Sequence, residues 1–446
     1  MSKDHKYNSL VIGGGIAGIS AALCLSAKGK KVLLVEASGR LGGRAGSVSD
    51  KKSGELLDTG QHVMTGAYKD FFKLLDFLGI RDKARPQDAL RVEFRQPGRS
   101  GYVLDTSFLP GKAGMIGGMI KMKGLSISSK LRAISLLAKL NSTVSFTEGL
   151  TVLEFLSKEK QTPEMIHKFW EPLVLATLNS SLDKVAASLF ITVMKEAFFS
   201  DKDNARLYFA ALDMGSFFDR TGSILEDKGG KLLLEKKASE IIIDKGLAAG
   251  VKLSSGEVYY AESVISALPP FMLKNLIPDI FSEKFNYLEK FIYSPIISIY
   301  LWYGRDPELP IFTALTGTKV HWVFNRRAIL EKSEVVYPGS LSLTISAADK
   351  MAAMPAKQII DIALKELSGL FHELNGYKPV HWKISRENKA TVLLTPGSLK
   401  LRPLPVTAIP GLYLAGDWTD TGLPATIESA AKSGRLAAEA VENYID

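Results

Sequence analysis

A glycine-rich turn near the start of the chain limits the possible folds more than any other feature of the sequence. The apolar run at residues 9–12 is short enough to be a buried strand, and it ends in the pattern Gly13-x-Gly15-x-x-Gly18. An Ala- and Leu-rich segment with helical spacing follows at once. This order of strand, turn and helix is the context that a dinucleotide-binding fingerprint requires. We therefore expect an α/β fold with a pyrophosphate at the N-terminus of the first helix.

The three glycines have different tasks in such a turn. Gly13 allows the tight turn, Gly15 lets the backbone approach the phosphates, and Gly18 lets the helix pack closely on the strand. The N–H groups of the first helical turn, at Ile16 and Ala17, have no partner within the helix, so they and the helix dipole can hold negative charge.

A second apolar strand, at residues 31–35, ends in Glu36 and is followed by Ala37. An acidic residue about 20 positions after the glycines is placed to accept hydrogen bonds from an adenosine ribose. Its charge would repel a 2′-phosphate. The pattern therefore favours FAD or NAD over NADP.

A second glycine pair, Gly42 and Gly43, precedes Arg44. The pair allows another close approach, which suits the additional length of a flavin dinucleotide, and Arg44 is available for a charge-assisted phosphate contact. The run at residues 40–44 resembles the segment after the acidic ribose ligand in the amine oxidase and carotenoid desaturase group of flavoproteins. The resemblance implies that the cofactor is FAD.

Further flavin contacts follow from this resemblance alone. In the group, a strand and turn matching residues 56–64 run beside the flavin ring, which makes Gly60, Gln61 and His62 candidates for the active-site wall. A residue at the position of Ala238 meets the adenine through its backbone.

The C-terminal segment carries a second cofactor signal. A short apolar strand ends at Gly416 and Asp417, where a carboxylate can orient groups of the ribityl chain or the pyrophosphate. A turn then opens a helix rich in small residues, whose N-terminus can present N–H groups to the flavin pyrimidine ring. The cofactor-binding candidates in this turn are Pro424, Ala425, Thr426 and Ile427.

Length and composition indicate the number of domains and the ligands to expect. A chain of 446 residues is too long for one ordinary core, so we expect two or three domains. One cysteine leaves no cysteine cluster for zinc or iron–sulfur, so no metal is expected. A net charge of +9 without a nucleic-acid motif or long basic run gives no reason to expect nucleic acid as a partner.

One region combines basic and apolar residues. Residues 106–147 contain six Lys and Arg side chains and no acidic residue, and residues 131–140 form an amphipathic pattern. This composition predicts a segment on a membrane surface, and a core helix with a solvated basic edge is the alternative. We find no signal peptide and no run of about 18 apolar residues, so we expect a cytoplasmic protein, peripheral on the inner face of the cytoplasmic membrane.

The domains follow from these motifs. Residues 1–90, 213–270 and 381–446 are expected to form a Rossmann-like FAD-binding domain. Residues 91–212 and 271–380 are expected to form an interleaved α+β substrate domain, with the helical subregion at 106–147 facing the membrane.

The resemblance becomes more specific at residues 169–179 and 321–326. With the C-terminal motif, these segments resemble the bacterial hydroxysqualene dehydroxylases, a squalene-associated branch of the desaturase group. The resemblance implies an FAD-dependent reduction of hydroxysqualene to squalene with loss of water, in squalene and hopanoid synthesis, by hydride from flavin N5. The expected substrate-binding residues are Phe169, Trp170, Leu173, Asn179 and Trp322.

Hydroxide leaves carbon poorly, so the site needs a general acid. Glu171 is the first candidate, because burial beside an apolar tunnel would raise its pKa and keep it protonated. His62 is the second. Because only one nucleotide fingerprint is visible, the electrons that reduce the flavin must come from an external donor.

Two other readings remain open. An FAD-dependent polyene desaturase of the phytoene type would have the same motifs but would remove hydride from its substrate instead of delivering it. A non-catalytic prenyl-lipid escort protein would share the architecture without needing a working flavin site. An amine oxidase fits less well, since no acidic cage for an ammonium group stands out.

Overall fold

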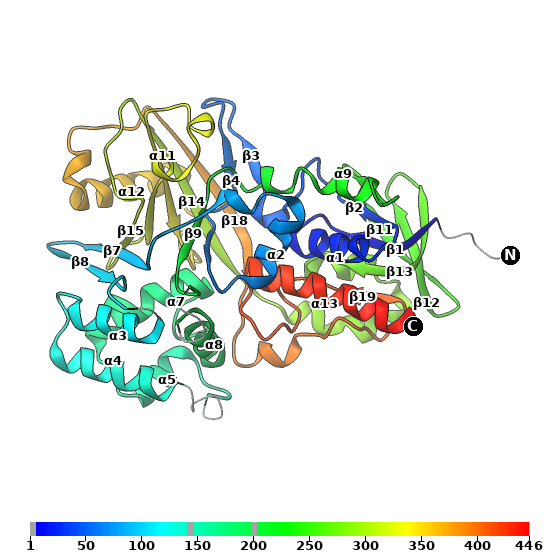
Figure 1. Ribbon diagram of the computed structural model, residues 1–446, viewed down its shortest axis with the longest axis horizontal. Coiled ribbons are helices and arrows are strands. Elements are labelled where there is room, and N and C mark those ends of the chain that lie inside the picture. The colour runs from blue at the N-terminus through cyan, green and yellow to red at the C-terminus, as the bar shows by residue number, and fades with distance from the viewer. Residues whose placement is uncertain (1–5, 110, 141–146, 199–202, 446) are drawn as a thin grey trace.

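The computed structural model describes residues 6–109, 111–140, 147–198 and 203–445. Two seven-stranded sheets form the body of the molecule. One sheet lies in the half that carries both chain ends. The other lies in the half that contains α3 (Gly111–Lys121), α4 (Ile127–Lys139), α5 (Val152–Lys158) and α12 (Ala356–Leu370) (Figure 1). The α/β fold class is confirmed.

The first sheet has the order β10-β2-β1-β13-β12-β11, with β19 paired to β13. Its pairs are parallel except for β13 with β12 and β12 with β11. The strands are β1 (Tyr7–Ile12), β2 (Val32–Val35), β10 (Lys231–Leu233), β11 (Ala238–Asp244), β12 (Leu247–Leu253), β13 (Val258–Ser266) and β19 (Leu412–Leu414).

Parallel strands of this kind are covered on both faces, which explains why β2 consists only of Val and Leu and is completely buried. Helix α1 (Ile16–Ala27) packs against α13 (Ile427–Ile445). A Cβ on Gly434 would lie 2.2 Å from the Ala17 carbonyl oxygen, so only glycine permits this close approach. The Ser20 hydroxyl donates to the Ala431 carbonyl at 2.7 Å. The two ends of the chain therefore meet in one layer.

The second sheet has the order β18-β14-β17-β16-β15-β7-β8. Its strands are β7 (Arg91–Gln96), β8 (Arg99–Asp105), β14 (Tyr293–Tyr303), β15 (Phe312–Leu315), β16 (Trp322–Asn325), β17 (Gly339–Ile345) and β18 (His381–Val392). Since β18 pairs with β14, the C-terminal segment beginning at residue 381 contributes to both sheets.

Two small sheets join these halves. One is the hairpin β3 (Ser47–Ser49) and β4 (Leu56–Asp58), and the other contains β5 (Val63–Thr65), β9 (Leu207–Ala210) and β6 (Ala84–Pro86). Next to β4, the buried carboxylate of Glu55 is ion-paired with Arg326, at the end of β16. Trp302 on β14 donates its indole N–H to Glu55 at 3.0 Å. This pair ties the hairpin to the second sheet.

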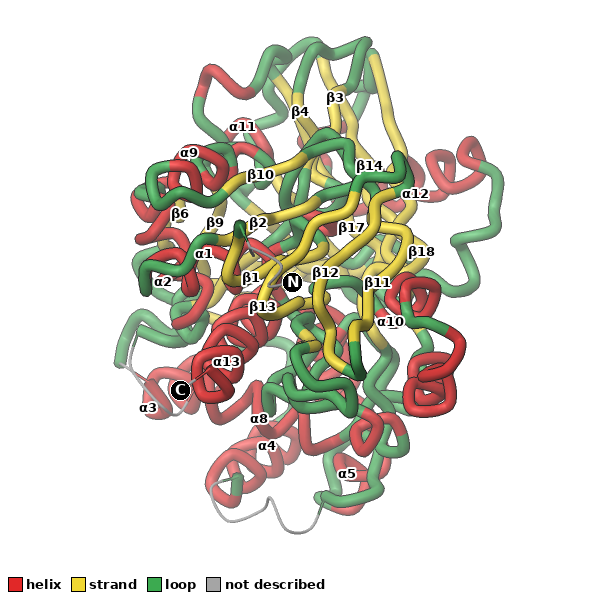
Figure 2. Tube along the Cα trace, turned by 90° about the vertical axis from the view of Figure 1, so that its right-hand side faces the viewer, coloured by secondary structure: helices red, strands yellow, loops and turns green. Residues whose placement is uncertain are grey.

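The remaining helices cover the sheets and build a helical end. Figure 2 shows α4, α5 and α8 at the end of the molecule opposite the β3–β4 hairpin. The α-helices are α2 (Lys69–Leu78), α3 (Gly111–Lys121), α4 (Ile127–Lys139), α5 (Val152–Lys158), α6 (Pro163–Met165), α7 (Glu171–Leu178), α8 (Ala187–Phe198), α9 (Thr221–Glu226), α10 (Pro270–Leu273), α11 (Arg326–Ile329) and α12 (Ala356–Leu370). The short turns are η1 (Gly43–Ala45), η2 (Arg81–Lys83), the π-helical η4 (Ile166–Trp170), η5 (Ser216–Phe218), η6 (Lys274–Leu276), η7 (Asp279–Lys290), η8 (Lys332–Glu334), η9 (His372–Leu374) and η10 (Ser398–Leu401).

Candidate cofactor and substrate site

A cavity of about 1200 Å³ runs between the two sheets. At one end its wall is the glycine turn after β1, and at the other it is an apolar surface from β7, α7 and β15. None of the helices in the described ranges is both long enough and apolar enough to cross a membrane. Among the same residues, no three His, Cys, Asp or Glu side chains gather as metal ligands.

The glycine turn forms part of the cavity wall. Gly13 has φ +103°, in the region that favours glycine. A Cβ built on Gly15 would meet nothing within 4 Å and would project into the cavity that Gly15 lines, whereas one on Gly18 would lie 1.9 Å from the Gly13 carbonyl oxygen. Ile16 and Ala17 also line the cavity, but Gly18 does not. The turn therefore leaves room for a phosphate, with Gly18 serving the packing.

The second glycine pair packs against this turn. Gly42 donates its N–H to the Gly14 carbonyl at 2.8 Å, and a Cβ on Gly43 would lie 3.2 Å from the Gly15 Cα. Gly42 and Gly43 both have positive φ and both line the cavity. Their lack of side chains thus serves the contact between two loops as well as the approach of a ligand.

The expected adenosine end of the site is assembled from two strand ends. Glu36 accepts the Gly14 N–H at 2.7 Å and the Ser38 N–H at 2.7 Å, so its carboxylate is fixed at the cavity wall. Ala37 and Ala238 line the same end. The hydroxyl groups of a ribose beside Glu36 could donate hydrogen bonds to this oriented carboxylate.

Arg44 and Asp417 come together although 373 residues separate them. The guanidinium donates to the Asp417 carboxylate at 2.6 Å and to the Ala390 carbonyl at 2.9 Å. Both residues line the cavity. The ion pair couples the Gly-Gly-Arg loop to the segment after β19, and the phosphate contact of Arg44 stays a prediction.

Near the start of α13, Pro424, Ala425, Thr426 and Ile427 all line the cavity. The Thr426 hydroxyl accepts the Ser429 N–H at 3.2 Å, which satisfies one of the free N–H groups at this helix start. The neighbouring Glu428 was not predicted. Its carboxylate lines the cavity and accepts the N–H groups of Asp70 and Phe71 at 3.0 and 2.8 Å, and burial raises its pKa to about 7. An acid in the first turn of a buried helix is a signal that could have identified it.

Gly60, Gln61 and His62 line the cavity, and their place beside the flavin ring stays a prediction. Burial lowers the pKa of His62 to about 4, so the imidazole is neutral at pH 7. Its Nε2 atom is buried without a hydrogen-bond partner among the described residues. A buried polar atom without a partner calls for an explanation, and a ligand contact is one.

The substrate end is apolar. Four of the five predicted substrate residues, Phe169, Leu173, Asn179 and Trp322, line it. Asn179 has φ +44° and bridges three segments, because its amide donates to the Thr391 hydroxyl at 2.9 Å and accepts the Ala347 N–H at 2.8 Å. The wall also contains apolar residues that the sequence did not single out: Leu90, Val92, Phe94, Leu104, Val193, Leu207, Phe312 and Phe324.

Two of the predicted catalytic and substrate-binding residues lie outside the cavity. The Glu171 side chain is 44% exposed and pairs with His167 at 3.1 Å, so the expectation of a buried acid beside the tunnel is wrong. Trp170 is completely buried, packs edge-on against Phe190 and donates to the Gln161 amide oxygen at 3.0 Å. It is a core residue behind the wall.

The fold and the site define a class of protein, the FAD-dependent oxidoreductases. Within that class, the sequence matches the family "flavin containing amine oxidoreductase" over residues 16–442, and the chain belongs to that family. Its cofactor is FAD, and the open space at Gly15 and the fixed carboxylate of Glu36 fit this ligand.

Relatives and solved structures are similar over nearly the whole chain. Hydroxysqualene dehydroxylase of Rhodopseudomonas palustris is 27% identical over 97% of this chain and 97% of its own length. The 15-cis-phytoene desaturase of Solanum lycopersicum is 25% identical over 97% of this chain and 77% of its own. A crystal structure of an oxidoreductase from Methanosarcina mazei has a TM-score of 0.74 at 18% identity, covering 98% of this chain and 100% of that one, which supports the fold.

Proposed function

We propose that this protein reduces hydroxysqualene to squalene with loss of water. The observation that carries the proposal is the continuity of the cavity from the FAD cradle into an apolar region walled by Leu90, Phe312 and Trp322. A long isoprenoid would be removed from water there, at a gain of about 25 cal/mol per Å² of apolar surface. The similarity to hydroxysqualene dehydroxylases along the full length of both chains favours this substrate.

The reaction needs one hydride and one proton. Bound in its reduced form, FAD would supply the hydride that replaces the hydroxyl on carbon, and the departing hydroxide would take up the proton to become water. An external electron donor must then reduce the flavin again for the next turnover. The chain has to hold the alcohol in place, exclude bulk water and deliver the proton.

His62 is the side chain we propose to contact the substrate hydroxyl. One ring nitrogen of His62 is engaged by the Arg44 backbone, so the Nε2 atom can form one hydrogen bond with the alcohol and orient it. Glu428, which also lines the cavity and has a pKa of about 7, is the residue that can hold the proton. Glu171 takes no part, because its side chain is outside the cavity.

Matched variants test the role of His62. We expect His62→Gln to bind FAD with an unchanged visible spectrum while the rate of squalene formation falls about 100-fold, a typical effect of misplacing the reacting group. Glu171→Gln is the control and should turn over at the normal rate. If both variants and the wild type form squalene at equal rates, His62 has no role in the reaction.

We also propose that α3 and α4 rest on a membrane surface. Ile127 and Leu131 are 77% and 62% exposed, and Phe108 is 52% exposed with the Lys121 ammonium 3.1 Å from its ring centre. Exposed apolar side chains among lysines suit an anionic bilayer surface. Residues 110 and 141–146 of the predicted segment 106–147 lie outside the described residues. The inner face of the cytoplasmic membrane is the proposed location.

A phytoene-type desaturase is the second candidate function, favoured by similarity to plant 15-cis-phytoene desaturases over 97% of this chain. Product analysis separates the two. Purified protein in detergent receives hydroxysqualene with reduced flavin, and in a separate reaction phytoene with oxidised flavin. Squalene in the first reaction alone supports the dehydroxylase, and desaturated phytoene in the second alone supports the desaturase. A lipid escort without catalysis would give neither product and would purify without colour.

A further inference from the structure

Polar side chains line the large cavity at the boundary between its two ends. Thr391 and Ser346 are part of this wall, and Asn179 hydrogen-bonds to Thr391 and to the residue after Ser346. Thr391 follows Ala390, whose carbonyl accepts the Arg44 guanidinium at 2.9 Å. Asn179 ends α7, which contributes to the apolar wall. A ligand in the apolar region therefore meets these polar groups where it approaches the FAD cradle.

The Asn179 amide determines how the Thr391 hydroxyl can act. The Ala347 N–H can only donate, so the amide oxygen is the atom that faces it, at 2.8 Å. The amide nitrogen then donates to the Thr391 Oγ1 at 2.9 Å and to the Ser294 carbonyl at 3.3 Å. Since the Thr391 oxygen accepts from Asn179, its own proton has no acceptor among the described residues. Thr391 is thus left as a hydrogen-bond donor at the cavity wall.

Two more hydroxyl groups lie at this wall without partners. Ser346 is 5% exposed, and its hydroxyl forms no hydrogen bond with any residue that the structure describes. Thr344, on β17, also lines the cavity, and its Oγ1 is buried without a partner in the same part of the chain. Buried hydroxyl groups without partners are costly, so a ligand that brings a polar atom would be favoured here.

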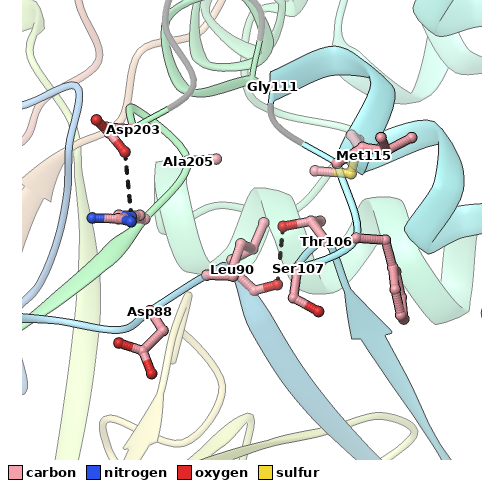
Figure 3. A pocket seen from close by; sticks show the side chains of 12 residues that line it. Asp88, Leu90, Thr106, Ser107, Gly111, Met115, Asp203 and Ala205 are labelled. Atoms are coloured by element: carbon pink, nitrogen blue, oxygen red, sulfur yellow. Dashed lines mark hydrogen bonds and ion pairs between the residues drawn. The ribbon is translucent and has the colours of Figure 1, made fainter.

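A smaller neighbouring cavity of about 260 Å³ provides a contrast. Figure 3 shows Asp203 and Thr106 in its wall. Asp203 is ion-paired with Arg206 at 3.3 Å, and the Thr106 hydroxyl donates to the Leu90 carbonyl at 3.2 Å. These polar groups have partners within the protein, whereas the hydroxyl groups near Asn179 are available to a ligand.

We propose that Thr391, Ser346 and Thr344 form a subsite that binds the hydroxyl group of an isoprenoid alcohol. A wall hydroxyl that faces a hydrocarbon loses its hydrogen bonds to water, whereas an alcohol replaces one of them. The subsite therefore selects an alcohol over the corresponding hydrocarbon. An alcohol oxygen has two lone pairs and one proton, enough for Thr391 and for His62 together. This inference rests on the proposed function, since it takes an isoprenoid as the ligand, and it favours hydroxysqualene over phytoene, which has no oxygen.

Binding without turnover tests the subsite. Oxidised holoenzyme, which has no hydride to transfer, is titrated in detergent with hydroxysqualene and, separately, with squalene. Tryptophan fluorescence reports binding, because Trp322 lines the cavity. The preference is the dissociation constant of squalene divided by that of hydroxysqualene. We expect the wild type to prefer the alcohol and Thr391→Val to lower the preference about fivefold, the effect of one lost hydrogen bond, with squalene binding unchanged.

Two further variants control for changes in packing. Thr391→Ser keeps the hydroxyl and should keep the wild-type preference. Thr177 also lines the cavity, but its hydroxyl donates to the Leu173 carbonyl within α7 at 2.8 Å, so Thr177→Val should leave the preference unchanged. Both ligands partition into the same micelles with every variant, so a changed preference reports the protein. The visible spectrum of bound FAD checks that each variant is folded.

The outcomes separate the subsite from the function. If Thr391→Val keeps the wild-type preference, or if Thr177→Val lowers it equally, the subsite is wrong. If the wild type binds both ligands equally but forms squalene from hydroxysqualene when reduced, the subsite is overturned and the proposed function stands. If the wild type binds neither ligand, both proposals fail.

Discussion

Gly15 and Gly18 belong to one motif, but an added methyl group would affect them differently. We predict that Gly15→Ala folds with unchanged stability and loses FAD, because its Cβ would enter only the open phosphate space. Gly18→Ala should destabilise the apoprotein by at least about 1–3 kcal/mol, since its Cβ would overlap the Gly13 carbonyl oxygen. Urea unfolding and flavin retention on gel filtration measure the two effects. Retention of FAD by Gly15→Ala would contradict the assigned phosphate site.

Glu428 gives a pH dependence with a definite sign. Its folded pKa, about 7, is above the ordinary 4.5, so the folded state binds a proton more tightly than the unfolded state. The resulting stabilisation is complete below pH 4.5 and is lost as the pH rises through 7, with an upper limit of about 3 kcal/mol. We predict that the urea midpoint of the wild type falls relative to that of Glu428→Gln between pH 5 and pH 7.5.

The comparison with a variant is necessary because other groups oppose this trend. The pKa of His62 and that of His321 are both lowered to about 4 by burial, so their contribution is lost as the pH falls from 6.5 to 4. The difference between wild type and variant cancels the histidine contribution. If the stability of the wild type relative to Glu428→Gln does not fall between pH 5 and pH 7.5, the Glu428 pKa is not raised.

Among the single elements, α4 has an amphipathic pattern that the sequence predicted. The sequence did not predict which of its apolar residues are buried and which are exposed. Leu137 and Leu140 are buried in the core, whereas Ile127 and Leu131 are exposed. The core alternative thus describes one side of this helix, and membrane contact of its exposed side stays a prediction. Helical spacing identifies an apolar arc, but only the neighbouring helices decide how much of it they cover.

The exposed part of α4 gives the third prediction. The double variant Ile127→Glu and Leu131→Glu should lose binding to anionic vesicles, because it removes apolar contact and adds like charge. Leu404→Glu, at another exposed leucine, is the matched control and should bind as the wild type does. Sedimentation with vesicles measures both. Unchanged binding of the double variant would rule out α4 as the contact surface.

The misplacement of Glu171 has a local physical cause. The π-helical turn at Ile166–Trp170 comes just before it and shifts the helical phase of the residues that follow. Nothing in the residue pattern marks this turn. By contrast, the glycine turn and Glu36 do line the cavity, because their geometry depends on the residues next to them.

At the scale of the whole molecule, the sequence predicted that both ends bind one cofactor, and α1 does pack against α13. It did not predict the side-chain pairs that lock distant segments together, such as Arg44 with Asp417 or Glu55 with Arg326. Such pairs depend on the final packing of elements and leave no periodic pattern in the chain.

The Glu55–Arg326 pair gives the fourth prediction. Arg326→Met should destabilise the protein by about 3–5 kcal/mol, because it leaves a buried carboxylate without its partner. Adding Glu55→Gln to that variant should recover much of the loss. Thermal unfolding of the two variants measures this, and a single variant as stable as the wild type would show that the pair does not hold the hairpin in place.

The most direct test of the proposed dehydroxylase reaction is a single turnover. Holoenzyme reduced without oxygen is mixed with hydroxysqualene in detergent, and flavin absorbance and squalene are followed together. If the protein reduces hydroxysqualene, oxidised flavin should return at the rate of squalene formation, with one squalene for each flavin. Flavin that stays reduced in the presence of saturating hydroxysqualene would contradict it.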